Sequence, residues 1–382
     1  MINPIGNIAN IALQFAFSFV AAGLACLTSA HADSKVKLWG RVGGDIMYID
    51  NIKTANKSQS RLSEGSNYGA SVFGINTTED LGGSTAVMVA LEGRFNPGSG
   101  TLMGQKLWGR AAYVALRNDT YGSIKFGQQK IINNFTYRFD PLAAQNFSSG
   151  TFVNSRNNAK FANTIRYDSP SFNGFEFSGS LSLGQGLDGF RTGPADPIVK
   201  NGTAWGVSAG LVKPTWEIRV LYDQVNNQNG QLDNLFISSS EIFLGIKKQF
   251  GPILIQAAFS RYWAPNTAPG LSKTAGFYWG GGTYDISPFL HTSAALYYIN
   301  TSDGKWTDDH DGGGHATMLA LGATYDLSKS TFLYMTAAHV FNSVHANFSV
   351  YPTGPGLKGG TDYSPVPGHG QNGVYTGFVT SF

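Results

Sequence analysis

Apolar side chains recur at every second position over several stretches of this chain. From Val36 to Tyr48 the even positions are mainly apolar, whereas the odd positions include Lys37, Arg41 and Asp45. The same alternation is found in 85–95, 175–183, 205–211, 216–223 and 374–382. A period of two predicts β-strands with one apolar and one polar face.

The connections between these stretches alternate between short and long. The short ones carry turn residues and are 80–83, 118–119, 173–174, 213–214, 250–252, 287–288 and 328–329. The long ones are polar and rich in Gly, Pro and Asn, and they are 51–68, 129–159, 184–203, 226–239, 301–315 and 342–372. Short turns on one side and long loops on the other are typical of an outer-membrane β-barrel, and we count about sixteen strands.

The composition separates this reading from a soluble β-sandwich. Only 13% of the residues are charged, and the chain contains 48 Gly, 26 Phe, 17 Tyr and 7 Trp. Soluble domains are about 25% charged, and the exposed face of a sandwich is commonly polar and charged. Here the non-apolar face is largely Gly, Ser, Thr and Ala with few charges.

A sheet whose apolar face meets lipid must close on itself, because the bilayer core offers no partner to unpaired backbone groups. We therefore expect residues 33–382 to form an all-β, sixteen-stranded antiparallel transmembrane β-barrel. A barrel of this width leaves an aqueous channel and is expected to have no dry core. Aromatic girdles at the membrane boundaries are expected from Tyr48, Tyr167, Tyr222, Tyr284, Tyr298, Tyr325 and Phe382, which fall near predicted strand ends.

The N-terminal segment has the pattern of an export signal. An apolar stretch over 11–27 is followed by Ala30, His31 and Ala32, which fits a signal peptide of residues 1–32. The alternative is a retained membrane helix, which is less favoured because the apolar stretch is short for a membrane span. The single cysteine, Cys26, lies in this segment, so the barrel contains no disulfide.

Other kinds of chemistry find little support. The net charge of +3 is too small for a nucleic-acid partner. The stretch 206–210 fits a hydrolase motif but lies within an alternating run, and 184–189 fits a dinucleotide motif without a following helix. The cluster Asp308, Asp309, His310, Asp311 and His315 offers metal ligands but reads better as a solvated loop. We expect no enzyme activity, cofactor or metal.

Several motifs make the chain resemble the general diffusion porins of the β-proteobacterial type. They are the stretches 36–40, 73–75, 78–83, 108–114, 163–170 and 325–329, together with Thr331, Tyr334 and the terminal Phe382. The resemblance covers essentially all of 33–382.

The resemblance implies a homotrimer in the Gram-negative outer membrane, surrounded by outer-membrane lipid and lipopolysaccharide. It implies delivery by periplasmic chaperones and insertion by the barrel assembly machinery, which reads the C-terminal strand with Phe382. It also implies that the third external loop, 129–159, folds inward to narrow the channel. Basic wall positions of the family fall on Arg110 and Lys160, whereas a third wall arginine of many relatives is replaced by Val72.

Charge near the predicted constriction favours anions. Between Tyr121 and Asp168 there are six basic residues and two acidic ones. The candidate pore-lining residues are Arg41, Glu92, Arg94, Arg110, Lys125, Asp140, Lys160 and Arg166. The alternative for these charges is that about half of them lie on loop surfaces or pair with carboxylates.

We therefore predict a water-filled channel for passive diffusion of ions and small hydrophilic solutes, with mild anion selectivity. The alternatives are a substrate-specific outer-membrane channel and an adhesin that uses the long loops.

Overall fold

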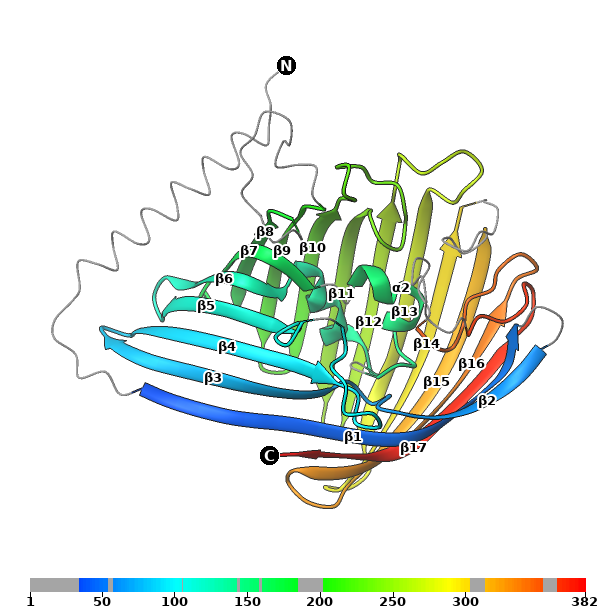
Figure 1. The fold of residues 1–382 in the computed structure, drawn as a ribbon, viewed down its shortest axis with the longest axis horizontal. Coiled ribbons are helices and arrows are strands. Elements are labelled where there is room, and N and C mark those ends of the chain that lie inside the picture. Colours follow the sequence, from blue (N-terminus) through cyan, green and yellow to red (C-terminus); the bar gives the residue numbers. More distant parts are fainter. Residues whose placement is uncertain are drawn as a thin grey trace.

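Seventeen strands form one antiparallel sheet that closes on itself in this computed structural model (Figure 1). The structure describes residues 34–53, 58–104, 106–142, 145–157, 160–184, 202–302, 313–352 and 363–382. The predicted signal peptide 1–32 and the cluster 308–311 lie outside these residues. Among the described residues, no helix has the length and hydrophobicity to span a bilayer.

The strands follow one another around the sheet in chain order. They are β1 (Ser34–Lys53), β2 (Ser58–Gly65), β3 (Ser71–Gly82), β4 (Thr85–Phe95), β5 (Ala111–Asn118), β6 (Gly122–Lys130), β7 (Lys160–Asp168), β8 (Phe175–Ser182), β9 (Ala204–Lys213), β10 (Trp216–Val225), β11 (Ser240–Phe250), β12 (Ile253–Trp263), β13 (Thr274–Asp285), β14 (Leu290–Thr301), β15 (Gly314–Asp326), β16 (Thr331–Asn342) and β17 (Gln371–Ser381). Two short helices, η1 (Ile132–Phe139) and α2 (Gly150–Asn157), interrupt this order.

The long strand β1 closes the barrel. On one side it pairs with β17, and on the other side it pairs with β3 along its first half and with β2 along its second half. β2 and β3 therefore fill one strand position between them. The prediction of a sixteen-stranded barrel is confirmed, with one position divided in two.

The C-terminal residue completes this closure. The Phe382 N–H donates to the carbonyl of Gly40, and the Gly40 N–H donates to the carbonyl of Phe382, both at 3.0 Å. The Phe382 ring occupies the space above Gly40, where an added Cβ would lie 2.3 Å from its Cζ. Because Gly40 has no side chain, the Phe382 ring can pack against the backbone of β1 at this position.

All seven predicted short turns connect neighbouring strands at the end of the barrel that also carries the termini of the sheet. The prediction of a loop over 51–68 is wrong, because β1 continues to Lys53 and β2 occupies Ser58–Gly65. β2 has no apolar alternation, since Leu62 is its only apolar residue. The connections 96–110 and 264–273 are also long and were not predicted.

The outer face of the barrel is apolar. Leu296 on β14 and Leu319 on β15 are outward register partners, and Ile246 on β11 lies in the same row of register positions; each side chain is about half exposed. Aromatic residues border this band at both ends: Trp205, Tyr222, Trp263, Tyr278 and Tyr298 toward the loops, and Phe250, Tyr284, Phe289 and Tyr325 toward the turns. Such girdles mark the two membrane boundaries.

The described part of the third loop, which we term L3 (131–142 and 145–157), lies inside the barrel, as predicted. Figure 1 shows α2 within the curve of the sheet. Side chains of L3, among them Phe139, Phe147 and Phe152, pack with inward residues such as Phe243 and Phe277 into one buried apolar cluster. The expectation that the barrel has no dry core is therefore wrong on this side, because L3 supplies the apolar surface that fills it.

Candidate functional site

L3 is fixed to one wall of the barrel by a buried ion pair. The Arg156 Nη1 in α2 lies 2.8 Å from Asp223 Oδ2 on β10, and both side chains are fully buried. The same guanidinium donates from Nε to Ser239 Oγ at 3.0 Å and from Nη2 to the Ser239 carbonyl at 3.1 Å. Removing either charge would leave the other one buried and uncompensated, so this contact holds α2 in place.

Asp140 forms a second anchor near the middle of L3. Its carboxylate accepts hydrogen bonds from the backbone N–H of Leu142 (2.9 Å) and Ser149 (2.7 Å) and from the Tyr297 hydroxyl (2.6 Å). Burial raises the pKa of Asp140, while these hydrogen bonds act in the opposite direction. The structure thus places this candidate pore-lining residue in the interior of L3, where it shapes the loop.

The far part of L3 is tied to the last strands. The Gln145 Oε1 accepts from the hydroxyls of Thr336 on β16 and Tyr375 on β17. Trp279 on β13 donates from Nε1 to the Phe139 carbonyl at 2.9 Å. L3 therefore covers the wall formed by β10 to β17, and the channel runs along the opposite wall.

That opposite wall carries a group of half-buried cations, which we term the basic cluster. Its members are Arg41 on β1, Arg94 on β4, Arg110 just before β5, Lys130 at the end of β6 and Lys160 at the start of β7. Arg110 is close enough to interact electrostatically with each of the other four. Four of the predicted site residues, Arg41, Arg94, Arg110 and Lys160, are thus brought together.

One carboxylate enters the basic cluster. Glu92 on β4 pairs through Oε2 with Arg110 Nε at 2.8 Å. Among the described residues, Arg94 and Lys130 have no carboxylate within 4.0 Å, and Arg41 donates instead to the Tyr68 carbonyl at 2.9 Å. In the described ranges, these five cations and one carboxylate give the basic cluster a formal charge of +4.

The strand register explains how the cluster forms around Val72. Val72 on β3 lies opposite Arg41 of β1 and opposite Arg94 of β4. Residues in register point to the same face, so the two arginines flank the apolar position on the channel side. Val72 itself carries no charge, but each neighbouring strand places an arginine beside it.

The remaining two predicted cations share one carboxylate, which cancels one of their two charges. Lys125 Nζ lies 2.9 Å from Asp168 Oδ2, and Arg166 Nη2 lies 2.8 Å from Asp168 Oδ1. Lys125 and Arg166 are register partners on β6 and β7, and they share this single carboxylate. Pairing with carboxylates, the alternative stated from the sequence, therefore holds for Lys125 and Arg166 as well as for Arg110.

A further charged network was not among the predicted site residues. Arg219 on β10 is buried and pairs with Glu176 (2.8 Å) and Glu217 (2.9 Å), and Glu217 also pairs with Arg138 and Lys247. The Arg219 guanidinium lies 4.3 Å from the centre of the Phe135 ring in η1. The alternation in 216–223 places Glu217 and Arg219 on the polar face of their strand, and this pattern could have identified them from the sequence.

Comparisons with known proteins agree with this architecture. A family model for Gram-negative porins matches residues 18–345. An outer membrane porin protein of Bordetella pertussis is 27% identical over 354 residues, which cover 82% of this chain and 91% of the relative. Outer membrane porin protein 32 of Delftia acidovorans is 25% identical, with 94% of this chain and 98% of the relative covered.

Solved structures share the fold. The anion-selective porin from Comamonas acidovorans superposes with a TM-score of 0.71 at 19% identity, over 92% of this chain and all of that one. OmpF of Salmonella typhi, solved with daunomycin, gives a TM-score of 0.61 at 15% identity, over 91% of this chain and 98% of that one. With a sixteen-position barrel, an inward third loop and this family match, the chain belongs to the Gram-negative porin family and forms an outer-membrane channel for passive diffusion.

Proposed function

We propose that the channel is a general diffusion pore that prefers anions. The observation that carries this proposal is the basic cluster, which faces the channel with a formal charge of +4 opposite the wall covered by L3. One unit charge acting on an ion 10 Å away contributes about 0.4 kcal/mol in water and about 1.7 kcal/mol at an effective dielectric constant of 20. Several such charges together favour anions several-fold.

The preference depends on salt concentration, because the channel is filled with water. The Debye length is about 8 Å at physiological ionic strength and about 3 Å at 1 M salt. Charges on the wall therefore act on a passing ion at low salt and are screened at high salt. The name of the Comamonas acidovorans porin, an anion-selective one, supports the same direction of preference.

Liposome swelling with three solutes of similar size tests this proposal. Gluconate is an anion, glucose is neutral and glucosamine is a cation. We expect gluconate to enter fastest and glucosamine slowest, with uptake of neutral sugars falling smoothly as their size increases. Faster entry of glucosamine would contradict anion preference, and a steep preference for one sugar would indicate a specific channel.

We also propose that the protein assembles as a homotrimer among outer-membrane lipid and lipopolysaccharide. The signal peptide 1–32 directs its export, periplasmic chaperones deliver it, and the barrel assembly machinery inserts it. One structural relative, OmpT of Vibrio cholerae, has been solved in a trimer form. Native mass spectrometry of the detergent-extracted protein tests the assembly state: three chains are expected, and a single chain at all concentrations would contradict the trimer.

A further inference from the structure

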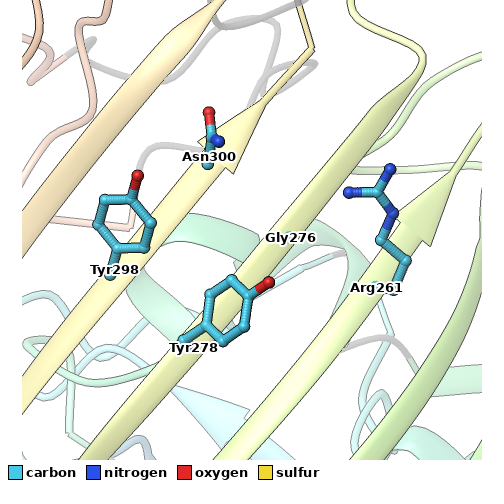
Figure 2. Close-up of a pocket in the computed structure, with 5 residues that line it drawn as sticks. All are labelled: Arg261, Gly276, Tyr278, Tyr298 and Asn300. Atoms are coloured by element: carbon cyan, nitrogen blue, oxygen red, sulfur yellow. The ribbon is translucent and has the colours of Figure 1, made fainter.

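A recess lined by aromatic and polar side chains lies on the outer wall of the barrel. It has a volume of about 340 Å³ and is lined by Arg261 on β12, Gly276 and Tyr278 on β13, and Tyr298 and Asn300 on β14. Figure 2 shows these residues on three neighbouring strands, with the Tyr278 hydroxyl pointing toward the side of Arg261. None of them takes part in the channel described above.

The strand register shows that the recess faces the lipid. Arg261 lies opposite Ile242 of β11 and opposite Gly276, which in turn lies opposite Asn300. Ile242 is an outward residue with about half of its surface exposed. Because register partners point to the same side, Arg261 and Asn300 also point outward.

The recess lies at the membrane boundary. Tyr278 and Tyr298 belong to the aromatic girdle at the loop end, and the Tyr278 ring contacts Phe259 with ring centres 4.8 Å apart. Aromatic residues with one polar atom collect where the acyl chains meet the headgroups. Arg261 lies one outward position beyond Phe259 toward the loops, so it is at headgroup level.

Gly276 keeps the recess open. An added Cβ at this position would lie 3.2 Å from Tyr278 Cε2 and 3.3 Å from its hydroxyl oxygen. A larger side chain would therefore displace the Tyr278 ring and fill the space beside Arg261. The absence of a side chain exposes one face of a tyrosine next to a guanidinium.

The Arg261 side chain is exposed and forms no hydrogen bond or ion pair with the part of the chain that the structure describes. A charged group facing lipid is costly unless it reaches the interface or finds a partner there. The planar guanidinium matches a phosphate group with two parallel hydrogen bonds. The tyrosine rings and the Asn300 amide beside this guanidinium suit the sugar ring that carries such a phosphate.

We propose that this recess binds the phosphorylated sugar headgroup of an outer-leaflet glycolipid. Arg261 pairs with the phosphate, Asn300 and the Tyr278 hydroxyl bond to the sugar, and the Tyr298 ring packs against it. The proposal deepens the proposed association with lipopolysaccharide and rests on it, because it assigns that association to one site. It is independent of solute passage, since every lining residue is on the outside of the barrel.

Binding of lipid A to the full-length protein in detergent, counted as adducts by native mass spectrometry, tests this site. We expect lipid A with its phosphates to bind and the dephosphorylated lipid to bind at least tenfold more weakly. Arg261→Gln should lose most of the binding, Arg261→Lys should retain part of it, and Gly276→Leu should block it. The matched control is Lys248→Gln, which removes an outward cation at the opposite rim, beside Phe250, and should bind like the unmodified protein.

Equal binding by Arg261→Gln, or equal binding of the dephosphorylated lipid, would overturn the proposal. Competition by micromolar inorganic phosphate would assign the site to free phosphate and would overturn the lipid as its occupant. Heat-modifiable mobility on gels shows that each variant is folded, and Arg261→Lys remains informative if Arg261→Gln is not. Planar-bilayer conductance of these variants should be unchanged, so that loss of channel function is distinguished from loss of lipid binding.

Discussion

The Nε atom of Arg110 lies 2.8 Å from Oε2 of Glu92, within the otherwise cationic wall of the channel. Both side chains are partly exposed to the channel, so the pair is screened and contributes little to the stability of the barrel. Its main effect is on the field that a passing ion meets. One carboxylate cancels one of the five positive charges in the basic cluster.

Replacing Glu92 by Gln should strengthen the preference for anions. The side chain keeps its size but loses its charge, which raises the formal charge of the cluster from +4 to +5. We expect the ratio of chloride to potassium permeability to rise about twofold or more at low salt, in line with the effect of one charge at about 10 Å. Zero-current potentials in planar bilayers measure this ratio. Asp119→Asn, at an exposed turn pair with Arg117, is the control and should leave it unchanged.

Breaking the buried pair of Arg156 and Asp223 should loosen L3. Removing one partner of a buried ion pair costs about 3–5 kcal/mol, because the remaining charge stays buried without its partner. We therefore expect Asp223→Ala to lower the free energy of unfolding, to raise single-channel conductance and to increase current noise. Arg117→Ala breaks an exposed pair instead and should cost less than about 1 kcal/mol. An Asp223→Ala channel with unchanged conductance and stability would contradict this role.

Asp140 should make the stability of the barrel depend on pH. Burial raises its pKa in the folded protein above the ordinary value of 3.8, so the folded state holds this proton more tightly than the unfolded chain does. Its contribution to stability is fully present below that value and is lost as the pH rises through the raised pKa, at up to about 1.4 kcal/mol per pH unit. Urea unfolding of Asp140→Asn and the unmodified protein over pH 4–8 measures this.

As the pH rises, Asp140→Asn should become more stable relative to the unmodified protein. A difference that is constant over the whole range would show that Asp140 does not titrate differently in the folded state.

Filling the space above Gly40 should interfere with closure of the barrel. A leucine at this position would collide with the Phe382 ring, because even a Cβ would approach it to 2.3 Å. We expect Gly40→Leu to reduce the folded, heat-modifiable fraction after refolding and to resemble deletion of Phe382. Gly44→Leu is a suitable control, because an added Cβ there meets nothing within 4 Å. Equal refolding of both leucine variants would contradict the importance of this contact.

The sequence predicts the strands well because each is long enough to show the alternation that lipid on one side and water on the other impose. The turns were found because Gly, Asn and Pro are required by their backbone; Gly82 and Gly83, for example, adopt positive φ values. β2 was missed because it has only one apolar residue, Leu62, to show an alternation. The positions of strands can thus be predicted from the local sequence.

The site was less predictable, because charge pairing depends on register. Asp168 pairs with both Lys125 and Arg166 only because β6 and β7 align in one particular way. Asp140 is near the constriction in sequence, yet the folding of L3 carries its carboxylate away from the channel water. Lys130 was counted as a charge but not as a site residue, since nothing local distinguishes it from a loop cation.

The most direct test of the account is the zero-current potential of the unmodified channel under a tenfold KCl gradient at low salt, compared with that of the double variant Arg94→Gln and Lys130→Gln. We predict that the unmodified channel passes chloride in preference to potassium, that the preference shrinks as salt rises, and that the double variant loses most of it. Lys125→Gln should change it less than the double variant does, because it removes one charge instead of two and Lys125 lies outside the basic cluster, 2.9 Å from Asp168. A potassium preference in the unmodified channel, or an unchanged chloride preference in the double variant, would contradict the account.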